Sequence, residues 1–309
     1  MKIPFTKKER TLFEVLSFLS AVTVFSIIFV IFSSLIFDSI PAIKMFGFKF
    51  LAGTKWDPVR DLYGALPQIY GTVATSVIAI LIAFPVGILT AFFLTEISPP
   101  SLSRTVSIGV ELLSAVPSII YGMWGLFVLA PIISKHIYIP LKEKFPDSPL
   151  FEGPPMGIGI FTASIILAIM VLPLIVSICS ELLLLVPNMV RESAYAIGAT
   201  KAEVSFGILL PYAKKGIIGA TFLALGRALG ETMAVTFVIG NQHKISPSII
   251  APSSTIASTL ANELSEAVTK LHVSSLVFLG LVLFLLSITV ISLSKYLIYA
   301  AEKSARGRK

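Results

Sequence analysis

Two charged residues lie four positions apart in one of the most apolar parts of this sequence. Arg227 and Glu231 occur in the segment GRALGETMAVT, residues 226–236. On a continuous helix this spacing places both side chains on one face. A guanidinium group stays charged in apolar surroundings and offers a planar fork of donors that fits the oxygens of phosphate. The pair therefore predicts a path for an oxyanion, in which the glutamate tempers the arginine so that the anion is not trapped.

A structural interpretation of the same pair stays open. An ion pair would offset part of the roughly 2.5–3.5 kcal/mol that one charge costs at the centre of a membrane helix. Such a pair stabilises little, because desolvation opposes the attraction, and the functional interpretation is therefore favoured. Gly226 and Gly230, also four positions apart, predict a surface for close packing by a partner helix.

The elements that must position these residues are membrane-spanning helices. Of the 309 residues, 55% are hydrophobic and 13% are charged, and the mean hydropathy is +0.92. Apolar runs of eighteen residues or more predict spans, and six occur, at 12–37, 69–94, 106–134, 157–187, 217–240 and 273–300. We therefore expect an all-α polytopic membrane protein, with one transmembrane domain (12–300) between an N-terminal tail (1–11) and a basic C-terminal tail (301–309). The first run is too long for a signal peptide.

Side chains for metal or covalent chemistry are sparse. The single cysteine, Cys179, falls inside a predicted span, and His136, His243 and His272 are far apart and show no ligand spacing. We expect ordinary solvated histidines, no metal site and no catalytic residue. The chain also lacks the phosphate-cradling pattern G-x-x-x-x-G-K-[ST]. No cofactor is therefore expected on this chain, and any ATP would be hydrolysed by a separate subunit.

Basic residues are distributed unequally between the predicted loops. With the N-terminus in the cytoplasm, the cytoplasmic segments carry a net charge of +8 and the outer loops +1. This asymmetry follows the positive-inside rule and predicts that both termini are cytoplasmic. The net charge of +7 therefore reflects topology and contact with anionic lipid, and no nucleic-acid partner is expected.

The longest cytoplasmic segment, residues 188–216, predicts two short helices that meet at an angle. Asn188 is expected to cap the first helix, with Glu192 in its first turn. Gly198 is expected to end that helix in the left-handed conformation.

The second short helix has its own start signal. Thr200 and Glu203 predict a capping box, and Leu210-Pro211 is expected to limit the helix. By local pattern alone, an amphipathic hairpin on the membrane surface is an equally good interpretation.

The spacing within this loop resembles the EAA loop of ABC-type importer permeases. The matching positions are Glu192, Ala194, Gly198, Ile208, Leu210 and Pro211. Ser193 departs from the usual alanine of the family but is still small. The resemblance implies that the loop is a coupling helix that sits in a groove of a cytoplasmic ATPase.

Four further segments resemble the PstC-type permeases of bacterial phosphate importers. They are WDPVRDLYGALPQIYGT (56–72), AVPSIIYGMWGLFVLAP (115–131), GRALGETMAVTFVIGN (226–241) and TIASTLANELSEA (255–267). The resemblance implies the type I ABC importer permease (MetI-like) fold and a place in the bacterial cytoplasmic (inner) membrane. It also implies a PstA-like sister permease in a heterodimer, two PstB-like ATPase subunits that use ATP and magnesium, and an external PstS-like phosphate-binding protein.

Other functions remain as alternatives. A permease for molybdate or sulfate is the nearest one. A secondary transporter or channel would use Arg227 and Glu231 as an ion site, but the spacing of the coupling loop argues against it. A membrane scaffold would have no use for a charged pair in an apolar span.

Overall fold

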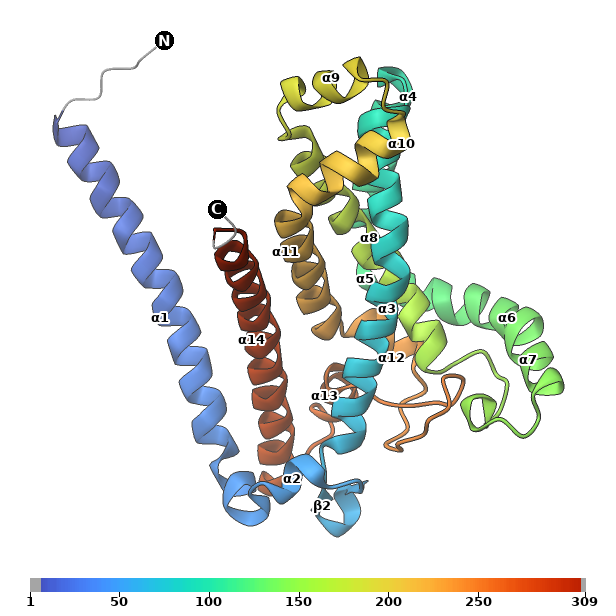
Figure 1. The fold of residues 1–309 in the computed structure, drawn as a ribbon. Coiled ribbons are helices and arrows are strands. Elements are labelled where there is room, and N and C mark those ends of the chain that lie inside the picture. The colour runs from blue at the N-terminus through green and yellow to red at the C-terminus, as the bar shows by residue number, and fades with distance from the viewer. Residues whose placement is uncertain (1–6, 307–309) are drawn as a thin grey trace.

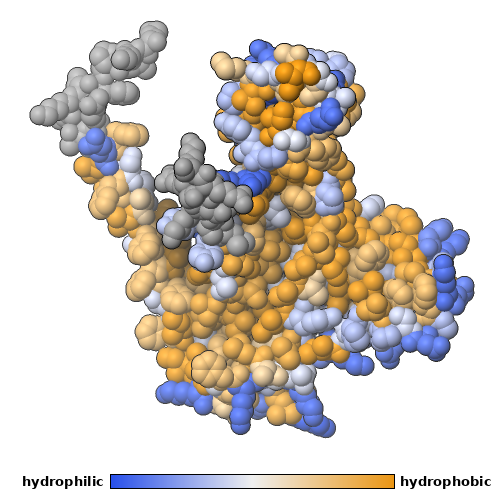
Figure 2. All heavy atoms as spheres, in the orientation of Figure 1, coloured by the Kyte–Doolittle hydropathy of each residue, from blue (hydrophilic) through white to orange (hydrophobic). Residues whose placement is uncertain are grey.

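The computed structural model describes residues 7–306, which form a bundle of helices (Figure 1). Six helices are long and apolar enough to cross a membrane: Phe13–Phe46, Leu66–Ile97, Ser118–Lys144, Ile160–Leu184, Lys201–Leu229 and Lys270–Tyr296. On the face shown in Figure 2, apolar residues form a broad band, and hydrophilic residues gather toward the extremities. The predicted all-α fold with six spans is confirmed.

The two ends of the bundle carry different structures. At one end, called the hairpin end, lie α2 (Lys49–Ala52) and the antiparallel strands β1 (Trp56–Asp57) and β2 (Leu62–Tyr63). At the other, called the loop end, lies α9 (Asn188–Ala196), and the start of α1 (Lys7–Phe46) and the end of α14 (Lys270–Arg306) lie toward this end as well (Figure 1).

The first and last helices extend beyond the predicted spans. α1 (Lys7–Phe46) and α14 (Lys270–Arg306) pack against each other and diverge toward the loop end (Figure 1). Both helices continue into the residues assigned to the tails, because Lys, Arg and Glu are good helix formers. The remaining tail residues, 1–6 and 307–309, lie outside the described part of the chain.

The centre of the bundle is formed by α3 (Leu66–Phe92) and α8 (Ile160–Leu184), which pack along each other. Their contact surface consists of fully buried apolar side chains, including Ala79, Ala83, Ile166, Leu167 and Ile175. Between membrane helices such a surface is held by close van der Waals packing, because lipid tails are as apolar as these side chains. These two helices therefore provide the rigid frame against which the other elements are placed.

The third span differs from the prediction. The chain forms α4 (Pro100–Ala115), α5 (Ser118–Trp124), α6 (Ala130–Ile133) and α7 (Ile139–Lys144). The predicted bounds 106–134 are wrong, because the span is Ser118–Lys144 and the preceding helix ends just before Pro117. A proline disfavours the helical conformation of the residue before it. From this break α5 leads into α6 and α7, which extend sideways from the bundle (Figure 1).

The fifth span also differs from the prediction. One continuous helix runs through α10 (Lys201–Val204), a π-helical turn (Ser205–Leu209) and α11 (Leu210–Leu229), and is followed by α12 (Met233–Val238) and α13 (Ile256–Glu263). The predicted span 217–240 is therefore wrong at both ends. Leu210-Pro211 does not limit the helix, because the π-helical turn before Pro211 interrupts the regular hydrogen-bond pattern where the proline lacks its N–H.

Candidate functional site

The fifth span is interrupted within the predicted site. Arg227 lies in the last turn of α11, whereas Glu231 lies beyond the helix, in the link Gly230–Thr232. The prediction that both side chains share one helical face is therefore wrong. Glycine and threonine are poor helix formers, and the Glu231 carboxylate accepts a hydrogen bond from the Ala234 N–H at 3.4 Å. Glu231 thus supports the start of α12 instead of extending α11.

Arg227 is not neutralised by Glu231. In the described part of the chain, its side chain forms no ion pair or hydrogen bond, and it is exposed, whereas Glu231 is half-buried. A positive charge in the last helical turn is favoured by the helix dipole. The guanidinium donors of Arg227 are therefore available to an anion or to another chain.

The element that follows the break is firmly packed. α12 contacts α5, α8 and α13. A side chain at Gly122 of α5 would lie 3.0 Å from Ala234 Cα and 2.8 Å from Phe237 Cδ2, so this approach requires a glycine. At the other end of α12, Asn241 adopts a φ of 50° and donates from Nδ2 to a carbonyl of the helix at 2.9 Å. The packing of α12 therefore fixes the position of the helix break on its C-terminal side.

The two glycines of the site lie in open surroundings within this chain. A Cβ at Gly226 would first meet Ile291 Cγ1 at 4.0 Å, and one at Gly230 would meet only neighbouring carbonyl oxygens at 3.9 Å. The predicted close helix packing is not formed inside the chain. A partner helix remains the prediction for this surface.

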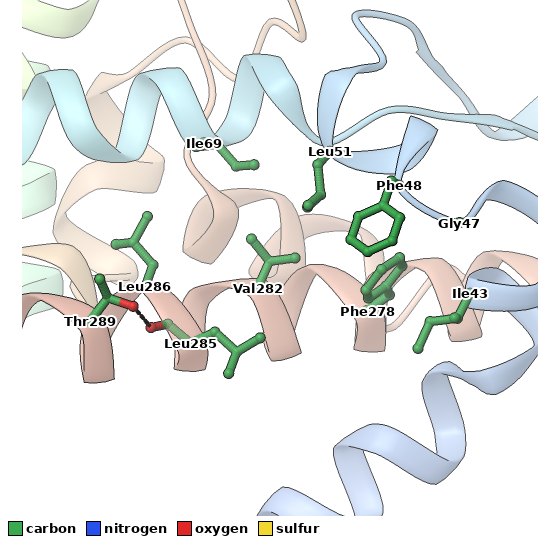
Figure 3. Close-up of a pocket in the computed structure, with 10 residues that line it drawn as sticks. All are labelled: Ile43, Gly47, Phe48, Leu51, Ile69, Phe278, Val282, Leu285, Leu286 and Thr289. Carbon is green, nitrogen blue, oxygen red and sulfur yellow. Dashed lines mark hydrogen bonds between the residues drawn. The ribbon is translucent and has the colours of Figure 1, made fainter.

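An apolar groove of about 440 Å³ lies between α14, α2 and α3 at the hairpin end (Figure 3). Its lining includes Phe48, Val282 and Leu286, and its one hydroxyl, on Thr289, donates to the Leu285 carbonyl at 2.8 Å. With no charged side chain and no spare donor, this groove cannot bind an anion. It therefore does not compete with Arg227 as the ion site.

The first helix of the predicted coupling loop ends as expected but begins differently. Gly198 has a φ of +88°, which confirms the left-handed end. The N-cap position belongs to Pro187, and the Asn188 side chain does not cap the helix. Glu192 lies beyond the first turn, because α9 begins one residue earlier than expected. Both predictions about the helix start are therefore wrong.

The second helix begins with the predicted capping box. The Thr200 N–H donates to Glu203 Oε2 at 2.7 Å, and the Glu203 N–H donates to Thr200 Oγ1 at 3.3 Å. The predicted coupling positions divide by exposure into Glu192, Gly198 and Pro211, which are exposed, Ile208 and Leu210, which are half-buried, and Ala194, which is buried. The loop therefore has one face on the bundle and one open to a partner.

An ion pair that sequence reasoning missed joins this loop to the second span. Arg191 Nη2 in α9 lies 3.3 Å from Glu96 Oε1, which belongs to the π-helical turn that ends the span. Tyr195 OH donates to Glu96 Oε2 at 3.4 Å. Burial, followed by the charge of Glu96, raises the pKa of Tyr195. No local pattern indicates this contact, because the residues are far apart in the chain.

A second missed network lies at the hairpin end. Glu263 accepts hydrogen bonds from Trp56 Nε1 at 2.9 Å, from His243 Nε2 at 3.1 Å and from His272 Nε2 at 3.0 Å. The prediction of ordinary solvated histidines is therefore wrong for these two, while His136 is exposed. Burial raises the pKa of Glu263, but these hydrogen bonds and the charge of His243 outweigh it, so the pKa is lowered.

Metal binding finds no support in the described residues, since no group of three or more His, Cys, Asp or Glu side chains is arranged to hold an ion. The network around Glu263 joins β1, the segment after α12, α13 and α14 by hydrogen bonds. The network therefore stabilises the arrangement of these elements at the hairpin end.

Comparison with known proteins identifies the type of chain. A family model described as binding-protein-dependent transport system inner membrane component matches residues 83–302. A phosphate transport system permease protein PstC of Mesorhizobium japonicum is 52% identical over 86% of this chain and 82% of its own length. The same-named protein of Pasteurella multocida is 47% identical over 94% of this chain and 91% of its own length.

Solved structures agree on the fold. A chain of the MetNI methionine ABC transporter in an inward-facing conformation has a TM-score of 0.59 and 17% identity, with 80% of this chain and 99% of that chain covered. A second crystal form has a TM-score of 0.54. At this identity the similarity concerns the fold alone, and it confirms the predicted MetI-like architecture.

Proposed function

The chain belongs to the family of binding-protein-dependent transport system inner membrane components, and we propose that it is the permease subunit through which an ATP-driven importer carries inorganic phosphate across the bacterial cytoplasmic membrane. The single observation that carries this proposal is Arg227. Its charge lies at a break in an apolar helix, without a partner in the described chain. PstC as the name of the similar proteins supports phosphate as the ion.

Arg227 is suited to a passing phosphate for three reasons. A guanidinium group binds oxyanions through two parallel hydrogen bonds. Its position at the end of α11 places it in the middle part of the molecule, between the loop end and the hairpin end (Figure 1). Discontinuous helices are how transporters commonly form ion sites inside the membrane.

Glu231 would set the selectivity of this path. A carboxylate accepts hydrogen bonds but cannot donate them. Monohydrogen phosphate carries an O–H that can donate to it, whereas sulfate at neutral pH carries none. The glutamate would also weaken the hold of Arg227 on the anion, so that binding does not stop transport.

The proposed partners are matched to two exposed surfaces of this chain. Gly226 and Gly230 offer close packing to a sister permease, and the exposed side of α9 offers Glu192 to a cytoplasmic ATPase. Two such ATPase subunits would supply ATP and magnesium chemistry, and an external binding protein would deliver phosphate at the hairpin end. In this arrangement the loop end and both termini face the cytoplasm.

The test is transport by the assembled importer in membrane vesicles. We expect ATP-dependent uptake of radiolabelled phosphate that excess unlabelled phosphate suppresses and excess sulfate or molybdate does not. Suppression by sulfate or molybdate at equal concentration would favour the alternative oxyanion. Uptake without ATP or an ATPase subunit would favour a secondary transporter.

Orientation has a separate test. A cysteine in place of Ser265, an exposed residue of the hairpin end, should react with a membrane-impermeant thiol reagent added outside the cell. The one native cysteine, Cys179, is buried and gives a low background. Labelling only from the cytoplasmic side would reverse the proposed topology.

A further inference from the structure

Glu192 and Arg191 are adjacent in α9 but face different surroundings. Glu192 is exposed on the side proposed for the ATPase, whereas the side chain of Arg191 is 14% exposed. Consecutive helical residues point about 100° apart. A displacement of α9 by an ATPase at Glu192 would therefore also displace Arg191, which contacts the bundle.

Arg191 contacts Glu96, whose side chain is 6% exposed, so a movement of Arg191 would act on Glu96. Two residues of α9, Arg191 and Tyr195, contact its two carboxylate oxygens from positions one helical turn apart. Arg191 also donates from Nη2 to the Leu183 carbonyl at the end of α8. Glu96 therefore connects two residues of α9 to the end of the second span.

The contact is only partly satisfied. Glu96 Oε1 and Arg191 Nε are buried without an aligned hydrogen bond among the described residues. Glu96 also lies in a π-helical turn, an irregularity that is frequent at functional sites. A buried ion pair adds little stability compared with apolar residues of the same volume. These features favour a contact between Glu96 and Arg191 that changes its geometry during transport over a contact that only stabilises the fold.

The second span connects this contact to the ion site. α3 continues from the π-helical turn of Glu96 as one helix and packs on α11. Val73 and Val77 of α3 line one apolar pocket together with Leu225 and Leu229, which flank Arg227. A 27-residue helix is about 40 Å long. It therefore reaches from the coupling loop to the break.

We propose that Glu96 and Arg191 are positioning residues that transmit movement of the coupling loop to α3 and thereby set how much phosphate is transported per ATP hydrolysed. This inference rests on the proposed function of the chain. The pair touches neither ATP nor phosphate. Its removal should therefore change the ratio of the two reactions more than the amount of assembled importer.

The experiment measures phosphate uptake and ATP hydrolysis in the same vesicles, with the complete importer at matched amounts. We expect Glu96→Gln and Arg191→Gln to lower the phosphate-to-ATP ratio by roughly five- to tenfold, a usual size for coupling between two sites. Glu143→Gln, a change at an exposed acid of α7, is the matched control and should leave the ratio unchanged. An unchanged ratio in both single variants would overturn the proposal.

Arg191→Lys is a second test, to be used if the neutral variants fail to assemble. It keeps the buried charges balanced but loses the fork of donors, so the ratio should fall by about two- to threefold. A native ratio in Arg191→Lys would contradict the proposal. If the unmodified importer takes up sulfate or molybdate instead of phosphate, the proposed function fails, and the same ratio is measured with that ion.

Discussion

Arg227 and Arg191 represent opposite uses of a charge near apolar surroundings. Arg227 has an acid only four positions away in the sequence, yet the helix breaks between them and no ion pair forms. Arg191 pairs with Glu96, which lies in a different helix far away in the sequence. Sequence spacing predicts contact only where the helix is continuous. Arg227, which has no partner among the described residues, remains available to an ion, whereas Arg191 connects two elements of the protein through its pair with Glu96.

The largest effect on phosphate uptake is expected from replacing Arg227, the arginine without a partner in this comparison. Arg227→Gln removes charge-assisted hydrogen bonds to phosphate worth about 3 kcal/mol, so uptake should fall by about a hundredfold. Membrane insertion should be preserved, since the side chain is exposed in this chain. The measurement is radiolabelled phosphate uptake at matched protein amounts. Uptake within twofold of the native protein would remove Arg227 from the path.

The next effect concerns the loop that carries Arg191. Gly198→Leu forces a branched side chain into the left-handed region, at a cost of about 1–2 kcal/mol. The angle between α9 and α10 should change, and co-purification of the ATPase should drop about tenfold. No atom lies within 4 Å of a Cβ at this position, so a steric clash is not the cause. Full co-purification would show that this turn is not needed for docking.

A smaller effect is expected at Glu231, because it has a second role at α12. Glu231→Gln removes the charge but keeps an acceptor for the Ala234 N–H. Uptake should slow by roughly two- to fivefold, the equivalent of up to about 1 kcal/mol, while phosphate binding should become tighter. Weaker binding in this variant would contradict the tempering role.

The smallest effect concerns the network at the hairpin end. Because the pKa of Glu263 is lowered in the fold, its contribution to stability is present above its ordinary value of 4.5 and is lost as the pH falls through the folded value. At pH 7, Glu263→Gln should lower the apparent Tm by a few degrees, and the difference should shrink as the pH falls below the ordinary value of 4.5 and through the lowered pKa of the folded state. Glu266→Gln, at an exposed acid, is the control. A difference independent of pH would exclude the ionised carboxylate as the cause.

Local chemistry explains which features could be predicted. The six apolar runs predict the number of spans, and Gly198 and the Thr200–Glu203 box follow from rules that act within one turn. The breaks at Pro117 and Gly230 lie inside apolar runs, where hydropathy alone cannot distinguish one helix from two. Hydropathy therefore gave the number of spans correctly but misplaced their ends.

The candidate site shows the same division. Arg227 and Glu231 are recognisable from the cost of charge in an apolar run, but their geometry depends on the packing of α12 against Gly122. Glu96 and Glu263 have partners that are distant in the sequence. No pattern within a single chain segment indicates such pairs, and only the fold brings them together.

The most direct test of the central claim is a double-mutant cycle at the broken helix. Phosphate uptake is measured for Arg227→Gln, Glu231→Gln and the variant carrying both changes, in vesicles with matched amounts of the assembled importer. Because Arg227 and Glu231 form no ion pair, the double variant should be as inactive as Arg227→Gln alone. Recovery of uptake in the double variant would show that the two charges merely neutralise each other, and it would contradict the role of Arg227 in the path of the ion.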